Sequence, residues 1–156
     1  AQLAAQSDWN FIFAAHLNGD KALLHDVLSF WQTHCARPTI VAVQVIVADS
    51  YDTAAQLAEN VQIWGVELED GQRVTVASEE QALAFAAQSG SPPRKIARRE
   101  QALLHGTAQE VMAKLNALHT QFGIDEFIID TPVAQGHARL TSLRLLAQAH
   151  NAVEVL

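Results

Sequence analysis

The order of apolar and polar residues predicts an α/β chain in which short buried strands alternate with helices. Residues 39–48 give the strongest strand signal, because they are almost continuously apolar and β-branched, as expected of a central parallel strand. Gln44 is the polar residue inside this run, and we expect it to point into a hydrogen-bonded interior. Residues 10–16 and 126–130 are predicted to form two further strands, which gives about three parallel strands in all.

Helices are predicted wherever apolar residues recur every three or four positions. The ranges are 21–33, 53–64, 107–122 and the stretch around 140–146. Thr107 and Glu110 have the spacing of a capping box, so they predict where the third of these helices begins. Gly123 follows the last apolar residue of that helix, where a left-handed glycine is favoured.

The rhythm of strand and helix is interrupted between residues 66 and 105. Turns are predicted at Asp70-Gly71 and at 89–93, with a helix at 79–88 that Ser78 can cap and a second short helix at 96–104. Connections between regular elements are normally short, so a segment of this length is expected to act as a lid or binding loop. The fold prediction is therefore α/β with a helical, lid-like excursion inside one domain.

Composition narrows the class of protein. A chain of 156 residues suits one domain with a real core, and a formal charge of -7 argues against nucleic-acid binding. The sequence has no apolar run long enough to cross a bilayer, so no membrane association is expected. Cys35 is the single cysteine, which permits no internal disulfide and suits a reducing cytoplasm. The first residues read as the tail of a helix, and the single methionine is Met112, so we expect residues 1–156 to be a fragment.

The pattern of strands and helices favours part of a (β/α)8 barrel. Three parallel strands leave open edges that invite further pairing. No glycine-rich phosphate turn follows any of the predicted strands, which argues against a dinucleotide-binding fold. A complete barrel typically needs about 250 residues, so this chain would supply the C-terminal portion of one.

The chain resembles the C-terminal part of the luciferase-like, flavin-dependent monooxygenases, the family that includes bacterial luciferase. The resemblance lies in the stretches GTAQEVMAKLNAL, FGIDEFIIDTPV, ARLTSLRLLAQA, VAVQVIVADSYDTAAQLAENVQIW and AQLAAQSDWNFIFAAHL, which occur in the family's order. They are similar to its last barrel strands and the helices around them. Ala108 departs from the family pattern, which usually has proline after the threonine.

The resemblance implies an enzyme that uses reduced FMN and oxygen to oxidise a small organic substrate, often an aldehyde. It implies that the first five strands are missing here and that this chain alone is inactive. FMN would be supplied by or with NAD(P)H, although relatives in this family can use a deazaflavin instead. The implied partners are flavin and substrate, and either a second copy in a homodimer or the missing N-terminal part.

Candidate site residues follow from the resemblance and from strand ends. His16 ends the first predicted strand, and the resemblance places it at the flavin pocket. Asp130 and Thr131 end the last strand at the same rim and are candidates for cofactor binding. Arg94 and Lys95 belong to a basic cluster in the excursion that could steer a phosphate, or could be a solvated face. No catalytic residue is identified, and the histidines have no ligand spacing, so no metal site is predicted.

Two other interpretations stay open. A natural half-barrel could pair its open strand edges with a copy of itself and serve as a non-catalytic module for self-assembly or flavin binding. Alternatively, the chain could be an ordinary α/β binding domain whose resemblance to the family is accidental.

Overall fold

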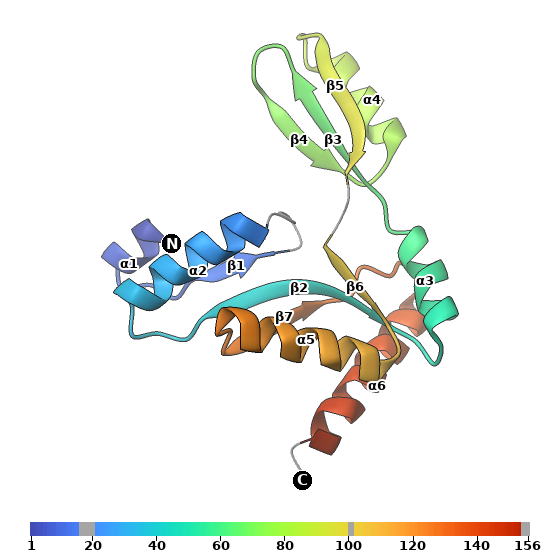
Figure 1. Cartoon of the computed structure of the whole chain (residues 1–156). Coiled ribbons are helices and arrows are strands. Elements are labelled where there is room, and N and C mark those ends of the chain that lie inside the picture. The colour runs from blue at the N-terminus through green and yellow to red at the C-terminus, as the bar shows by residue number, and fades with distance from the viewer. Residues whose placement is uncertain (16–20, 100–101, 154–156) are drawn as a thin grey trace. The chain divides into compact units, whose positions relative to one another are not determined.

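The computed structural model describes residues 1–15, 21–99 and 102–153, which fall into two compact units (Figure 1). The large unit combines Ala1–Ala58 with Ala102–Leu156, and the small unit is Glu59–Gln101. Each unit has its own sheet. The predicted α/β class with parallel strands is confirmed in the large unit, and the described residues do not form a closed barrel.

The large unit contains a four-stranded parallel sheet centred on β2 (Ile40–Val47). β1 (Ile12–Ala14) and β7 (Glu126–Asp130) both pair with the first part of β2, so they lie on its opposite edges. β6 (Leu103–Gly106) pairs with residues 44–47 of β2. The three predicted strands are confirmed, and β6 is a fourth that the periodicity did not reveal.

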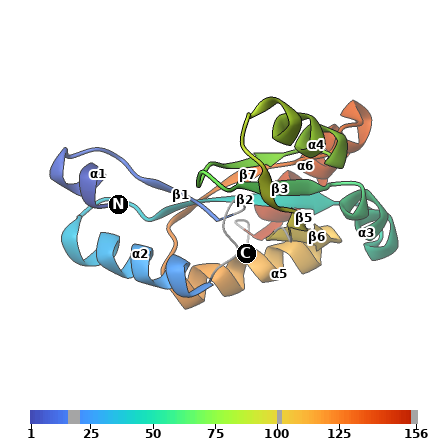
Figure 2. The same ribbon diagram turned by 90° about the horizontal axis from the view of Figure 1, so that it is seen from above.

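The described part of the large unit has five helices, of which α1 precedes β1 and the other four each follow one of its strands. They are α1 (Gln2–Gln6), α2 (Lys21–His34), α3 (Tyr51–Glu59), α5 (Ala108–Phe122) and α6 (Gly136–Val153). Figure 2 shows α2 and α5 on the same side of β2. No helix among the described residues is both long and apolar enough to span a membrane.

The core of the large unit lies against one face of the sheet. Alternate residues of β2 point to opposite faces, and only one set joins the main apolar cluster, namely Val41, Val43, Val45 and Val47. Leu28 of α2, Leu115 of α5 and Leu146 of α6 pack in the same cluster. The helices therefore cover one face of the sheet, here called the helix-covered face.

The other face, here called the second face, follows from the strand register. It carries Ile40, Ala42, Gln44 and Ile46 of β2, with Ile12, Ile128, Asp130 and His105 at paired positions on the neighbouring strands. Ile12 and Ile128 on this face are 48% and 39% exposed. Large apolar side chains left in solvent on a sheet face are typical of a surface that other chain segments cover.

A side-chain amide ties the amino-terminal ends of β2 and β7 to two helices. Gln32 Nε2 donates to the carbonyl oxygens of Phe122 and Gly123, both at 2.9 Å, and lies 3.2 Å from Thr39 Oγ1. The backbone N–H of Thr39 donates to Asp125 Oδ2 at 2.7 Å. Gly123 adopts φ 61°, ψ 43° and its N–H donates to His119 O, so the predicted left-handed C-cap is confirmed.

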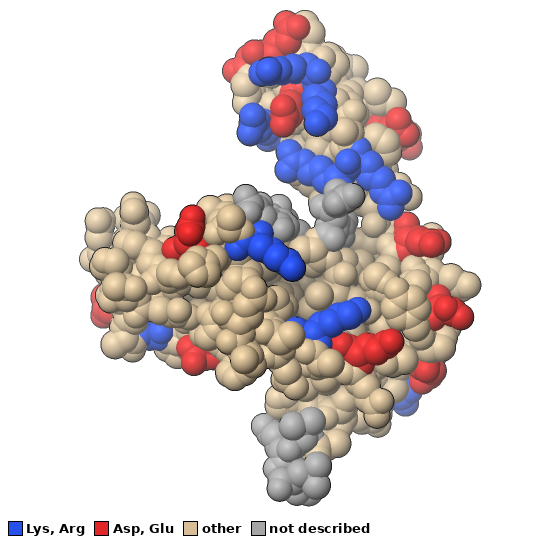
Figure 3. Space-filling view, in the orientation of Figure 1, with Lys and Arg blue, Asp and Glu red and all other residues tan. Residues whose placement is uncertain are grey.

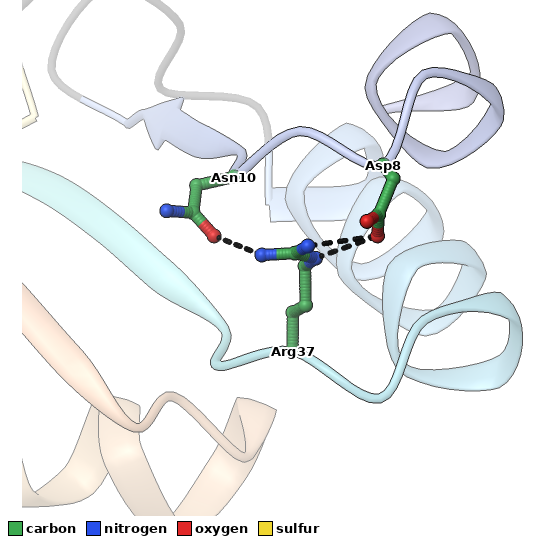
Figure 4. A network of polar contacts seen from close by, with 3 residues as sticks. All are labelled: Asp8, Asn10 and Arg37. Carbon is green, nitrogen blue, oxygen red and sulfur yellow. Dashed lines mark hydrogen bonds and ion pairs between the residues drawn. The ribbon is translucent and has the colours of Figure 1, made fainter.

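Arg37 holds the segment before β1 against the start of β2 (Figure 4). Its Nε and Nη2 donate to Asp8 Oδ1 at 3.1 and 2.8 Å, and its Nη1 donates to Asn10 Oδ1 at 2.9 Å. Asp8 is a non-glycine residue at φ 55°. The planar guanidinium satisfies two partners at once, which fixes the direction in which the chain enters β1.

The small unit is a three-stranded antiparallel sheet with one helix packed on it. β3 (Ile63–Leu68) lies between β4 (Arg73–Val76) and β5 (Pro93–Arg99). The helix α4 (Glu79–Gln88) is capped by Ser78 as predicted. Val66, Leu68 and Ala82 form the buried centre, and the partly buried residues packed on it include Trp64, Val74, Phe85 and Ile96.

Two helix predictions are wrong in this part of the chain. The helix predicted at 53–64 ends at Glu59, because Ile63 and Trp64 begin β3. The helix predicted at 96–104 is replaced by the end of β5 and the start of β6. The excursion therefore contains more strand than helix. In β5, pairing with β3 outweighs the helix propensity of the alanine and arginine residues.

The predicted capping box of α5 is confirmed and gives an expected pH dependence. Thr107 N and Oγ1 donate to Glu110 Oε2 at 2.8 and 2.9 Å. The backbone hydrogen bond from Thr107, followed by its hydroxyl, lowers the pKa of Glu110 from its ordinary value of 4.5. A lowered pKa in the folded state means that this stabilisation is present above about pH 4.5 and is lost as the pH falls through the folded-state value.

The unfolding free energy of the wild type should fall as the pH drops below 4.5. We expect it to fall less in Glu110→Gln. Denaturant titrations over a pH series would measure this, with Glu69→Gln, in an exposed turn, as the matched control. Equal acid sensitivity of wild type and Glu110→Gln would contradict the prediction.

Candidate site at the carboxyl edge of the parallel sheet

The carboxyl ends of the parallel strands meet at one edge of the large unit. β2 ends at Val47, β6 at Gly106 and β7 at Asp130. In parallel α/β folds this edge carries the functional residues, because the loops that leave it can vary without disturbing the sheet. The candidate site is therefore sought on the second face near this edge.

Gln44 and Asp130 form a polar pair on the second face. They are register partners across β2 and β7, and Gln44 Nε2 donates to Asp130 Oδ2 at 2.9 Å. The prediction that Gln44 finds a hydrogen-bond partner is confirmed, but the pair is exposed and not inside a core. The carboxylate keeps a second oxygen, and the amide keeps a second N–H and a carbonyl oxygen. The pair can therefore both donate to and accept from a bound molecule.

Thr131 follows directly and is the least satisfied side chain at this edge. It is only 6% exposed, and its hydroxyl oxygen is buried with no hydrogen-bond partner among the described residues. A buried hydroxyl without a partner costs about 1–3 kcal/mol. Such a cost is typical of groups kept for a ligand, an ordered water or catalysis.

An aromatic pair lies at the same edge beside β6. His105 pairs with Ile46, so it shares the second face with Gln44, and its ring lies 5.6 Å from that of Tyr51. Lys114 Nζ donates to the carbonyl oxygen of His105 at 2.7 Å, which fixes the backbone of β6. Sequence reasoning missed this pair because it depends on β6, and the alternation of apolar Leu104 with polar His105 was the signal that could have revealed it.

The structure separates the residues predicted from the sequence. Asp130 and Thr131 end β7 as predicted. Arg94 and Lys95 are exposed on β5 of the small unit, so they belong to a different unit from Asp130. His16 lies outside the described residues. Asp130 and Thr131 together with Gln44, His105 and Tyr51 are the residues that can be assembled into one site.

A cavity of about 640 Å³ lies elsewhere, between α5, α6 and β7. Its walls are mainly apolar and include Leu115, Phe127 and Leu146 from the helix-covered face. His119 and His150 also line it, and His119 Nδ1 lies 2.6 Å from Ile124 O. Across the described part of the chain, no three histidine, cysteine, aspartate or glutamate side chains are grouped so that they could hold a metal ion.

The candidate site offers hydrogen-bonding groups beside apolar surface. A planar heteroaromatic ring needs both, since its edge carries donors and acceptors and its faces are apolar. The Gln44–Asp130 pair matches the edge, and Ile128 offers apolar surface on the same face. These residues therefore fit the ring of a flavin.

Comparison with known proteins gives similarities in both sequence and structure. No family model matches the chain. The sequence is 27% identical over 150 residues to N-acetyl-S-alkylcysteine monooxygenase of Bacillus subtilis (strain 168), covering 94% of this chain and 45% of that protein. The crystal structure of apo-MsnO8 matches with a TM-score of 0.62 at 15% identity, covering 95% of this chain and 46% of that one.

These matches have two direct consequences. The likeness to apo-MsnO8 covers nearly the whole chain, so the described arrangement of strands and helices is a known fold. The chain spans about half the length of each protein it matches.

Proposed function

We propose that this chain is the C-terminal part of a flavin-dependent monooxygenase of the luciferase-like family. The proposal rests on the sequence similarity to a protein named as a monooxygenase, which extends over 94% of this chain. The parallel sheet with helices packed on one face supports it, because a (β/α)8 barrel has its helices outside and its second face inside. The exposed Ile12 and Ile128 are accounted for if further strands close over that face.

In this proposal the site described above forms one part of the flavin pocket. Reduced FMN, when bound, would supply the electrons that reduce one atom of O2 to water, while the other atom is transferred to a small organic substrate such as an aldehyde. Gln44 and Asp130 would hold the edge of the ring and fix its orientation, and the unpartnered hydroxyl of Thr131 would be a further contact with the cofactor. Arg94 and Lys95 of the small unit would attract the phosphate of FMN or of a nicotinamide donor.

The rest of the pocket would come from other strands. Residues 1–156 would be one incomplete domain, completed either by an N-terminal part of the same polypeptide or by pairing in a homodimer. Since the relative is named for N-acetyl-S-alkylcysteine, a compound of that class belongs beside aldehydes among the substrates to be tried.

The protein purified from its native source tests this proposal. Its intact mass would be compared with the 17.0 kDa of these residues, and reduced FMN would be titrated into the same sample without oxygen. We expect a longer polypeptide, or an assembly of copies, that binds reduced FMN and consumes O2 when substrate is added. A native 17.0 kDa chain that binds no flavin would refute the enzyme and favour the non-catalytic half-barrel.

Thr131→Val gives a sharper test of the pocket in the same protein. Valine has nearly the shape of threonine without the unpartnered hydroxyl, so we expect unfolding free energy to stay level or rise by about 1 kcal/mol. If the hydroxyl binds the flavin, affinity for reduced FMN should fall about fivefold, as for the loss of one hydrogen bond. Thr120→Val, on the exposed surface of α5, is the matched control and should leave flavin affinity unchanged.

A fall in stability with unchanged flavin affinity would show that the Thr131 hydroxyl serves the fold and not the ligand.

A further inference from the structure

The sheet of the small unit has two faces of different chemistry. Trp64, Val66 and Leu68 alternate along β3 on the face that packs against α4. The intervening residues define the other face, here called the basic face. By register it carries Gly65, Glu67, Arg73, Thr75, Lys95, Ala97 and Arg99.

Three cations from two strands converge on this basic face. Arg73 and Lys95 are the register partners of Glu67 on opposite sides of β3. Neighbouring strands are about 4.8 Å apart, so the backbones of Arg73 and Lys95 are separated by about 10 Å. The backbone of Arg99 lies further along β5, but its side chain lies across Gly65. A β-carbon at position 65 would collide with Arg99 Nε. The absence of a side chain at Gly65 therefore lets the third cation lie over the centre of the face.

The charges on this face are not balanced. Glu67 is its single carboxylate, and Arg73 Nε lies 3.8 Å from Glu67 Oε1. Lys95 and Arg99 have no carboxylate partner among the described residues. Five of the ten basic residues of the chain lie in the small unit, where Figure 3 shows them gathered, together with seven of its seventeen carboxylates, so the excess of cations is confined to the basic face. Those five are Arg73, Arg94, Lys95, Arg98 and Arg99.

We propose that the basic face binds the phosphate groups of a nucleotide. Gly65, Thr75 and Ala97 at its centre are small, so a phosphate can reach the Arg99 side chain that lies over Gly65, with Arg73 and Lys95 at neighbouring register positions. A diphosphate is long enough to contact cations on both outer strands, and Arg99 can bind phosphate oxygens through two N–H groups. This proposal rests on the phosphate role proposed above for Lys95 and extends it to Arg73 and Arg99, but binding of pyrophosphate can be measured whether or not the protein is a monooxygenase.

The whole protein in low-salt buffer tests this by calorimetric titration with pyrophosphate, ADP, adenosine, FMN and NADPH. Pyrophosphate and ADP should bind, adenosine should not, and affinity should fall as salt is raised, because exposed charges are screened. Lys95→Ala and Arg99→Ala should each weaken pyrophosphate binding about fivefold, and the double variant more than tenfold. Glu67→Gln should tighten it, since this removes the one carboxylate from the face.

The comparison ligands identify the source of the phosphate. Tighter binding of FMN than of pyrophosphate would assign the face to a flavin phosphate, and tighter binding of NADPH would assign it to a nicotinamide donor; either supports the proposal. Arg144→Ala is the matched control, because Arg144 is an exposed cation on α6 in the large unit. An equal effect of Arg144→Ala, an unchanged affinity in the double variant, or no binding of pyrophosphate would overturn the proposal.

Gly65→Ala is a second variant that leaves every charge in place. It should weaken pyrophosphate binding because the new β-carbon displaces Arg99. If Arg99→Ala weakens binding but Gly65→Ala does not, Arg99 does not act from its position over Gly65, and the assigned geometry is wrong.

Discussion

Replacing Trp31 with alanine is expected to lower the free energy of unfolding by about 3–5 kcal/mol, the range for removing a buried aromatic side chain. Trp31 is 0% exposed, and its ring centroid lies 5.4 Å from that of Phe11. Its indole Nε1 also donates to Pro38 O at 3.2 Å, so alanine would leave both a cavity and an unpaired carbonyl oxygen. Denaturant unfolding followed by far-ultraviolet circular dichroism measures the loss without relying on tryptophan fluorescence.

Trp9→Ala is the matched control for this experiment. Trp9 belongs to the same unit but is 61% exposed, so its removal should change unfolding free energy by about 0.5 kcal/mol or less. If Trp31→Ala is too unstable to fold, Trp31→Phe keeps most of the volume and should still cost more than Trp9→Phe. Similar losses at the two positions would contradict the buried, hydrogen-bonded placement of Trp31.

Ser142→Ala should cost about 1–3 kcal/mol, the cost of leaving a buried donor unsatisfied. Ser142 of α6 is 1% exposed, and its hydroxyl oxygen accepts the backbone N–H of Val47 at 2.8 Å. This bond joins the last helix to the end of the central strand, next to the candidate site. Faster hydrogen exchange of the Val47 amide should accompany the loss of stability.

Ser29→Ala is the control for Ser142→Ala, because Ser29 also lies in a helix but is exposed. Its side chain makes no hydrogen bond among the described residues, so the change should be close to neutral. An unchanged exchange rate at Val47 in Ser142→Ala would mean that another group, or water, satisfies this amide.

Sequence patterns predicted the large unit better than the small one. The run of apolar residues at β2 and the Thr107–Glu110 capping box depend on neighbours in sequence, and both were found where predicted. β5 and β6 depend on partners that are distant in sequence: Ile96 pairs with Val66, and His105 pairs with Ile46. Local propensity favoured a helix there, and tertiary pairing decided otherwise.

The candidate site was predictable only in part for the same reason. Asp130 and Thr131 could be predicted as site residues because the proline that follows them marks the carboxyl end of a strand. Two further facts came from the register and packing of strands that no spacing reveals. These are the hydrogen bond from Gln44 to Asp130 and the lack of a partner for the Thr131 hydroxyl.

The arrangement of the large sheet around β2 also bears on how the chain reaches its native state. Every other strand of that sheet pairs with β2, and the Gln44–Asp130 contact joins residues 86 positions apart. Closing loops of that length loses chain entropy before any packing compensates for it. The small unit is continuous in sequence, and its turn between β3 and β4 is short. The inserted segment is therefore positioned to form first. By shortening the effective loop between β2 and β6, it would speed the assembly of the sheet of the large unit.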